Sequence, residues 1–193
     1  MSNETVKNNF FEQIKIFLKK NIKILIILII VIFILLCSFL FYKNIQDKNN
    51  IKVAESFTQA SILVKQKKIE ESKLLLENII SQDHQFYSPL ALYIMIDKNI
   101  EKDTSKIIIL FDKILDNNSI ENENLNLIKI KKAIYLINLN NEKLILETLN
   151  PIINSNSVWK NLAINLISEY FISNGQSIKA NEYIKLLDKI NNK

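Results

Sequence analysis

The amino-acid sequence predicts an all-α protein, with one N-terminal transmembrane helix followed by a domain of helical hairpins. Three observations lead to this prediction. Residues 24–42 carry no charge, and the 193 residues include one glycine and two prolines. In the rest of the chain, apolar residues recur every three or four positions, which is the spacing of one face of a helix. So few turn-forming residues leave little for the tight turns of a β-sheet.

The segment 24–42 is long enough to cross a bilayer. As a helix with a rise of 1.5 Å per residue it extends roughly 28 Å, close to the ~30 Å thickness of the hydrocarbon core. A buried helix of a soluble protein shows polar residues at every turn or so. In this run Ser38 is the only such residue. We therefore predict a transmembrane helix over 24–42.

Two other uses of an apolar N-terminal segment fit this stretch poorly. A secretory signal has about 7–15 apolar residues and then a small-x-small cleavage site, but here the run leads into Leu40, Phe41 and Tyr42. A lipid attached to Cys37 would require a small residue before it, where Leu36 stands. The sequence therefore favours a permanent anchor.

Lysines around the span predict its orientation. They are more numerous before the span, at positions 7, 15, 19, 20 and 23, than directly after it, at positions 43, 48 and 52. Because positive loops stay in the cytoplasm, we expect residues 1–23 to form a basic cytoplasmic segment. The domain 43–193 is then expected outside the cytoplasm, with Phe41 and Tyr42 in the aromatic belt of the far interface.

The charge and composition exclude several classes of function. The formal net charge is +5, and all 25 basic residues are lysine. Arginine is the preferred side chain for phosphates and bases, so its absence argues against a nucleic-acid partner. The single glycine rules out a P-loop or a dinucleotide-binding loop. We accordingly expect no nucleotide cofactor.

The ionisable residues also give no pattern for catalysis or metal binding. The only cysteine lies in the span, so the domain has no thiolate zinc site. The only histidine, His84, falls in a polar connector, and one imidazole without a nearby nucleophile makes no triad. We therefore expect no metal, no cofactor, no small-molecule substrate and no enzymatic activity, unless through an unrecognised site.

Helix punctuation divides the domain into short helices. We expect Ser88 before Pro89, Asn118 with Glu121 three residues later, Asn141, and Ser157 to cap helix starts. The predicted helices span 46–66, 69–81, 88–97, 104–116, 120–138, 142–153, 158–173 and 177–191.

Alternate helices begin near residues 70, 104, 141 and 177, a spacing typical of tetratricopeptide (TPR) hairpins. The last unit places Ile167, Ser168, Phe171, Gly175, Ala180 and Ile184 where that pattern has apolar, small, aromatic, turn-glycine, small and large residues. The first unit matches more loosely, with Ala60, Ile69, Ser72 and Leu76. The middle units lack the turn glycine and the small positions. This predicts a TPR-like solenoid, with a plain helical bundle as the alternative.

Anchor and hairpins together resemble the bacterial family of ancillary Sec-translocon subunits. The resemblance is greatest from Pro151 through Trp159 to Gly175. It implies a single-pass protein of the bacterial inner membrane whose periplasmic repeat domain is an adapter. It also implies association with Sec channel subunits and with a membrane-anchored periplasmic foldase or chaperone.

The bare geometry of a repeat array points to the inner face of each first helix as the partner-binding groove. That face would present Ser61, Lys65, Asn165 and Glu169. Trp159 is expected to pack between hairpins rather than to contact a partner. Three alternatives remain open: a scaffold for cell division or envelope assembly, an unliganded spacer, and an envelope enzyme with an unrecognised site.

Overall fold

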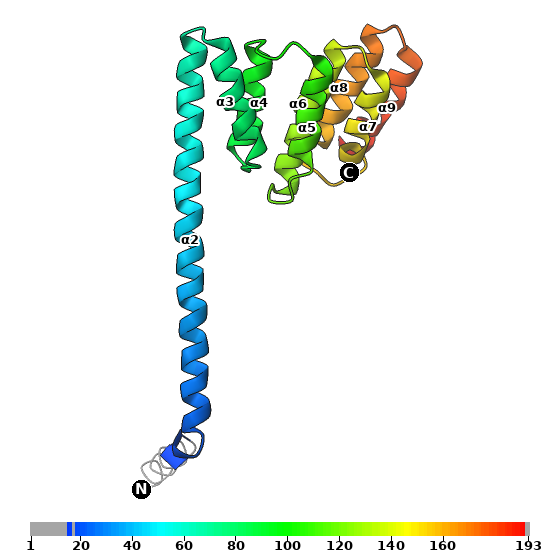
Figure 1. Cartoon of the computed structure of the whole chain (residues 1–193). Coiled ribbons are helices and arrows are strands. Elements are labelled where there is room, and N and C mark those ends of the chain that lie inside the picture. The colour runs from blue at the N-terminus through cyan, green and yellow to red at the C-terminus, as the bar shows by residue number, and fades with distance from the viewer. Residues whose placement is uncertain (1–14, 17, 192–193) are drawn as a thin grey trace. The chain divides into compact units, whose positions relative to one another are not determined.

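The computed structural model describes residues 15–16 and 18–191, and their regular secondary structure is entirely helical, as the sequence predicts (Figure 1). Residues 1–14 and 17 of the expected basic segment, among them Lys7, lie outside the described residues. Residues 192–193 of the expected repeat domain also lie outside them.

The first long helix, α2, runs from Ile22 to Lys65 without a break. The predicted transmembrane segment and the helix predicted over 46–66 are therefore parts of one continuous helix, which ends at Lys65. The physical reason is in the sequence: no proline or glycine occurs between Ile22 and Lys65, and polar residues alone do not terminate a helix.

Seven further helices follow, and their bounds lie within two residues of the predicted ranges. They are α3 (Ile69–Ser81), α4 (Tyr87–Asp97), α5 (Thr104–Leu115), α6 (Asn122–Asn138), α7 (Glu142–Ile153), α8 (Lys160–Ser173) and α9 (Ser177–Asn191).

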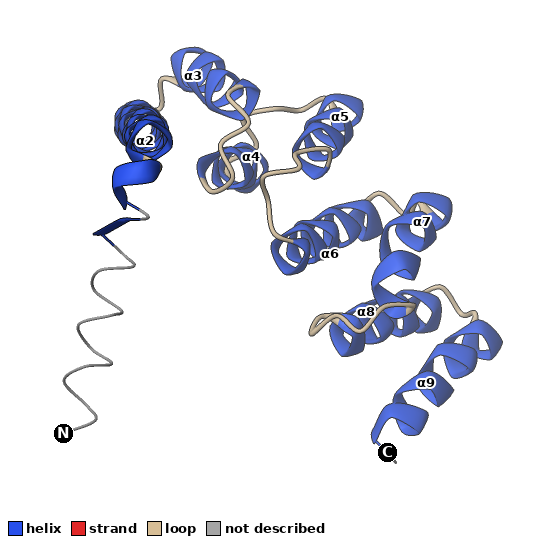
Figure 2. Cartoon of the chain, turned by 90° about the horizontal axis from the view of Figure 1, so that it is seen from below, coloured by secondary structure: helices blue, strands red, loops and turns tan. Residues whose placement is uncertain are grey.

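The chain divides into two compact units, residues 1–52 and residues 53–193. The second unit contains the last turns of α2 and helices α3–α9. From α3 onward each helix packs against the next one in the chain, and α6 also approaches α8 (Figure 2). Contacts mainly between chain neighbours are also typical of helical repeat proteins.

One of the four predicted helix caps is present and three are absent. Asn141 caps α7, where its side-chain oxygen accepts a hydrogen bond from the backbone N–H of Leu144. Ser157 does not cap α8, which starts after Trp159 without a side-chain cap, although the Ser157 hydroxyl accepts from the backbone N–H of Trp159 in the preceding turn. Asn118 makes no cap, and α6 instead starts after Glu121 without a side-chain cap.

Ser88 is not a cap either, because α4 already begins at Tyr87. The buried Ser88 hydroxyl donates instead to the backbone carbonyl of Ile79, at 3.0 Å. His84 takes over the capping role: its Nδ1 accepts from the backbone N–H groups of Phe86 and Tyr87, at 3.1 and 3.2 Å. The only histidine of the chain thus orders the start of α4.

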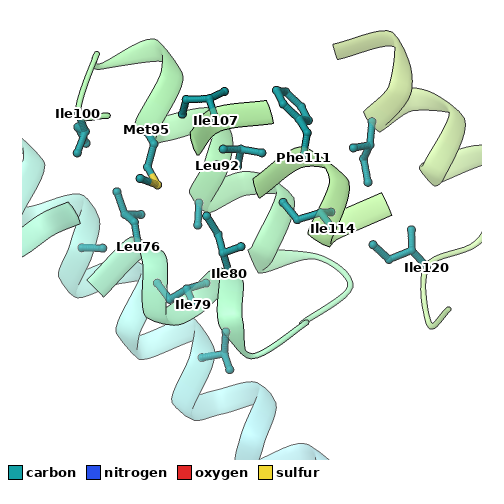
Figure 3. Close-up of a cluster of buried hydrophobic side chains, with 14 residues drawn as sticks. Leu76, Ile79, Ile80, Leu92, Met95, Ile100, Ile107, Phe111, Ile114 and Ile120 are labelled. Carbon is teal, nitrogen blue, oxygen red and sulfur yellow. The ribbon is translucent and has the colours of Figure 1, made fainter. Parts of the chain in front are cut away.

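The core of the second unit consists of two clusters of buried apolar side chains. The first extends from the end of α2 to the start of α6, and Leu76, Leu92 and Phe111 lie inside it (Figure 3). The second extends from α6 to α9, around Leu149 and Phe171. Helix α6 contributes to both clusters, so it joins the two halves of the array.

Four of the turns between helices share one backbone geometry. In each, a residue with positive φ follows the first helix: Lys67 (φ 61°), Asn99 (50°), Asn140 (52°) and Gly175 (71°). The N–H of this residue donates to the carbonyl three residues before it, and the next N–H donates to the carbonyl five residues before itself. This is the Schellman motif of helix C-termini. It recurs after α2, α4, α6 and α8, and therefore marks four successive hairpins.

Candidate partner-binding surface

The shared turn gives the four hairpins a common register. Seven residues before each positive-φ residue stands a fully or almost fully buried side chain, and four residues before it stands another. The first set is Ala60, Leu92, Ala133 and Ser168, and the second is Leu63, Met95, Leu136 and Phe171.

The second helix of each hairpin continues the register. Ser72, Ile145 and Ala180 each lie five residues after the turn residue and are buried. In the α4–α5 hairpin the equivalent buried residue is Ile107, because the connection contains the three additional residues 101–103. Ser72 and Ser168 satisfy their hydroxyls within their own helices, on the carbonyls of Ile69 and Ile164.

The residues expected to pack the repeats are placed as follows. Ala60, Ser72, Ser168, Phe171 and Ala180 are buried between helices. Gly175 is exposed, and a Cβ built on it would meet nothing within 4 Å. Glycine is therefore favoured at this position by the positive φ of the turn and not by close packing.

Trp159 is half-buried just before α8 and is bound to the start of α6. Its indole Nε1 donates to the backbone carbonyl of Glu123, at 3.0 Å. The Glu123 carboxylate in turn accepts from the Ser157 hydroxyl at 2.7 Å and from the N–H of Val158 at 3.2 Å. Trp159 thus belongs to a set of contacts that joins two successive hairpins.

Of the four residues expected to contact a partner, Lys65, Asn165 and Glu169 are exposed. Ser61 is half-buried, and its hydroxyl donates to the carbonyl of Phe57 at 2.9 Å. Ser61 and Glu169 occupy the same position in their hairpins, six residues before the turn residue. The four residues come from α2 and α8 alone, the first helices of the first and last hairpins.

Sequence reasoning missed the equivalent residues of the two middle hairpins. They are Tyr93 in α4 and Ile134 in α6, each six residues before its turn residue. We call Ser61, Tyr93, Ile134 and Glu169 the first-helix row. Asn99 and Asn140 are the signal in the sequence that could have revealed them. Asparagine is second only to glycine in tolerating a positive φ.

The middle of the first-helix row is apolar. Ile134 is 40% exposed although it is a large aliphatic residue. The hydroxyl of Tyr93 is buried and has no hydrogen-bond partner among the described residues. Burial raises the pKa of Tyr93 to about 12. Tyr93 therefore stays neutral, and its buried hydroxyl is not accessible at the surface.

Ion pairs join α3, α5 and the α4–α5 connection in the first half of the second unit. Glu101, in the α4–α5 connection, is buried, and its Oε2 lies 2.8 Å from Nζ of Lys73 and 3.3 Å from Nζ of Lys106. Lys106 also pairs with Glu77, at 2.6 Å. The Lys73 ammonium, followed by the backbone N–H of Asp103, holds the pKa of Glu101 down at about 2.

A second ion pair joins the two halves of the core. The buried ammonium of Lys132 in α6 pairs with the more exposed carboxylate of Asp112 in α5, at 2.5 Å. Beside it, the rings of Phe111 and Tyr135 lie 6.1 Å apart and tilted. The junction between α5 and α6 is therefore partly polar.

Two hollows of the surface lie near the connections between hairpins. One is lined by Asp83, Asp112 and Asn117, and another by Glu123, Asn126 and Ser157. Within the described residues no group of three or more His, Cys, Asp or Glu side chains could hold a metal ion.

No family model matches the chain, and neither a curated protein nor a solved structure is significantly similar to it.

Proposed function

We propose that this chain is a membrane-anchored adapter with a TPR-like repeat domain, ancillary to Sec-dependent protein export and periplasmic folding. Its partners are then proteins: subunits of the Sec channel, and a membrane-anchored periplasmic foldase or chaperone. In this proposal α2 crosses the bacterial inner membrane once, residues 1–23 are cytoplasmic, and the domain from residue 43 is periplasmic.

The observation that carries the proposal is the common register of the four hairpins. In the tetratricopeptide pattern a small residue precedes an aromatic one by three positions, and after the turn a second small residue precedes another aromatic by four. Three of the four hairpins have alanine or serine at the first small position, and Phe171 of the last is aromatic three residues later. This agreement supports a TPR-like array over a plain bundle.

The membrane anchor is supported by the first part of α2. This helix includes an 18-residue stretch with a mean hydropathy of 3.6, none of which is buried inside the protein. Such a stretch is long and apolar enough to cross a membrane. The lysines before it support a cytoplasmic N-terminus.

The first-helix row supports a polypeptide as the ligand. It combines an exposed aliphatic residue (Ile134), the half-buried side chain of Tyr93 and an exposed carboxylate (Glu169). Apolar and polar groups arranged on successive helices suit side chains and backbone groups of an extended segment. Tethering also raises the local concentration of such a surface near membrane partners, so weak binding suffices. We propose no enzymatic activity.

The proposal is tested by affinity purification of the full-length protein after crosslinking in living cells. We expect Sec channel subunits or a membrane-bound foldase among the proteins identified by mass spectrometry. Recovery of division or cell-wall proteins alone would contradict the export assignment and favour a scaffold for division or envelope assembly. Recovery of no protein above a control that carries α2 alone would instead favour a spacer.

Charge reversal tests the exposed ends of the surface. We expect K65E and E169K to reduce recovery of these partners without changing the amount of folded protein. K143E is the matched control, because Lys143 on α7 is exposed and pairs with Glu147. Undiminished recovery with both variants would remove Lys65 and Glu169 from the interface.

A further inference from the structure

We infer that residues 15–16 and 18–23 form a binding surface for anionic phospholipid headgroups on the cytoplasmic side of the membrane. This inference rests on the transmembrane part of the proposed function, and is independent of the partners of the repeat domain. Four lysines carry it: Lys15, Lys19, Lys20 and Lys23.

The local structure exposes both the charges and the apolar residues between them. Residues 15–16 and 18–20 are helical, and a turn at Asn21 leads into α2. The four lysines are exposed, and none forms an ion pair with another residue in the described part of the chain. Ile16 and Leu18 are 65% and 45% exposed, so a large part of each apolar side chain is left uncovered.

Charge complementarity selects the occupant of this surface. No acidic residue occurs between positions 13 and 23, and the segment leads directly into the apolar stretch of α2. Lysines at that depth meet lipid headgroups, and clusters of four or more attract anionic lipids. The apolar residues between them match a segment that lies in the membrane interface.

The opposite end of the apolar stretch differs and serves as a control. Lys43, Lys48 and Lys52 follow the span, but Asp47 lies among them. The net charge of residues 43–52 is therefore +2, against +4 for residues 15–23. The preference for anionic lipid should come chiefly from the N-terminal side.

The test uses the full-length protein reconstituted in phosphatidylcholine vesicles with a trace of spin-labelled lipid. Electron paramagnetic resonance separates lipid immobilised at the protein from bulk lipid. We expect a several-fold stronger immobilisation of spin-labelled phosphatidylglycerol than of spin-labelled phosphatidylcholine. High salt should weaken this preference, because it screens the lysines.

Two variants decide the result. Replacing the four N-terminal lysines (K15Q, K19Q, K20Q and K23Q) should abolish the preference, whereas K43Q with K48Q and K52Q should retain most of it. Equal loss in both variants, or an unchanged preference in the first, would overturn the inference. If neither labelled lipid is immobilised, the chain does not cross the bilayer, and the inference fails together with the anchor. If phosphatidylcholine is immobilised without a preference, only the inference fails.

Discussion

The indole nitrogen of Trp159 donates a hydrogen bond to the backbone carbonyl of Glu123, 36 residues earlier in the chain. This contact joins the loop before α8 to the first turn of α6. The side chain is half-buried, and its one polar group is engaged inside the protein. A residue held in this way stabilises the junction of two hairpins rather than offering a free surface to a partner.

Replacement of Trp159 should therefore reduce stability more than binding. We expect W159A to lower the free energy of unfolding by about 1–3 kcal/mol, through lost packing and one lost hydrogen bond. W159F, which keeps an aromatic ring, should recover part of it. The stability of both variants is measured by circular dichroism during thermal unfolding, because replacing the only tryptophan removes the tryptophan fluorescence signal. Unchanged stability with reduced partner recovery would show that Trp159 is instead a binding residue.

We expect substitutions at Gly175 to change stability through the backbone conformation and not through a steric clash. We expect G175A to destabilise the protein by about 1–2 kcal/mol, the cost of a left-handed conformation for a residue with a Cβ. The space around Gly175 is open, so a clash does not contribute. G175N should cost less than G175A, because asparagine tolerates this conformation.

The matching control is at Asn99, which has the same positive φ. N99G should leave stability nearly unchanged, whereas N99A should reduce it as G175A does. Chemical denaturation of the four variants provides the comparison. A stable G175A variant would contradict the requirement for the shared turn geometry.

For the pair formed by Lys132 and Asp112, we expect replacement of one partner to cost more stability than replacement of the other. Removing the exposed carboxylate (D112A) leaves a buried ammonium without its partner, so we expect a loss of about 1–3 kcal/mol. K132M replaces the buried charge by an apolar chain of similar length and should cost less. Unfolding free energies of the two single variants and of the double variant give the comparison. Equal losses in the two single variants would contradict this account.

Glu101 predicts a dependence of stability on pH. The Lys73 ammonium, the Asp103 N–H and Lys106 lower its pKa from the ordinary 4.5 to about 2 in the folded protein. Since the folded value lies below the unfolded one, its contribution is present above about pH 4.5 and is lost as the pH falls toward 2.

We therefore expect E101Q to be less stable than the wild type at pH 7, with a difference that shrinks between pH 4.5 and 2. Thermal unfolding across this range measures it. E70Q is the control, because Glu70 is exposed on α3. A difference between E101Q and wild type that stays constant with pH would rule out the ion-pair explanation.

Much of the fold follows from local patterns. Apolar spacing and the polar residues between the stripes predicted helices such as α3 and α7 with the bounds that the structure has. The local pattern failed at the end of the apolar segment, because apolar and polar residues can both continue a helix. No residue between Ile22 and Lys65 breaks a helix, so α2 continues where the change from apolar to polar composition suggested an end.

The register of the middle hairpins could not be predicted from the sequence, because the tetratricopeptide pattern has glycine at the turns. Asn99 and Asn140 adopt the positive φ that Gly175 adopts in the last hairpin, and Ala133 supplies the small residue that the third hairpin was thought to lack. Without this register, Tyr93 and Ile134 could not be aligned with Ser61 and Glu169. The polarity of each residue could be read from the sequence, but not its place in the row.

The most direct test of the adapter account is site-specific photo-crosslinking from Ile134 in living cells. A photoreactive amino acid at Ile134 lies on the first-helix row, and the same amino acid at Ile109 on α5, where isoleucine is also exposed, is the control. The account predicts crosslinks from position 134 to a Sec channel subunit or a membrane-bound foldase, and few or none from position 109. Crosslinks of equal yield from both positions, or none from position 134, would contradict it.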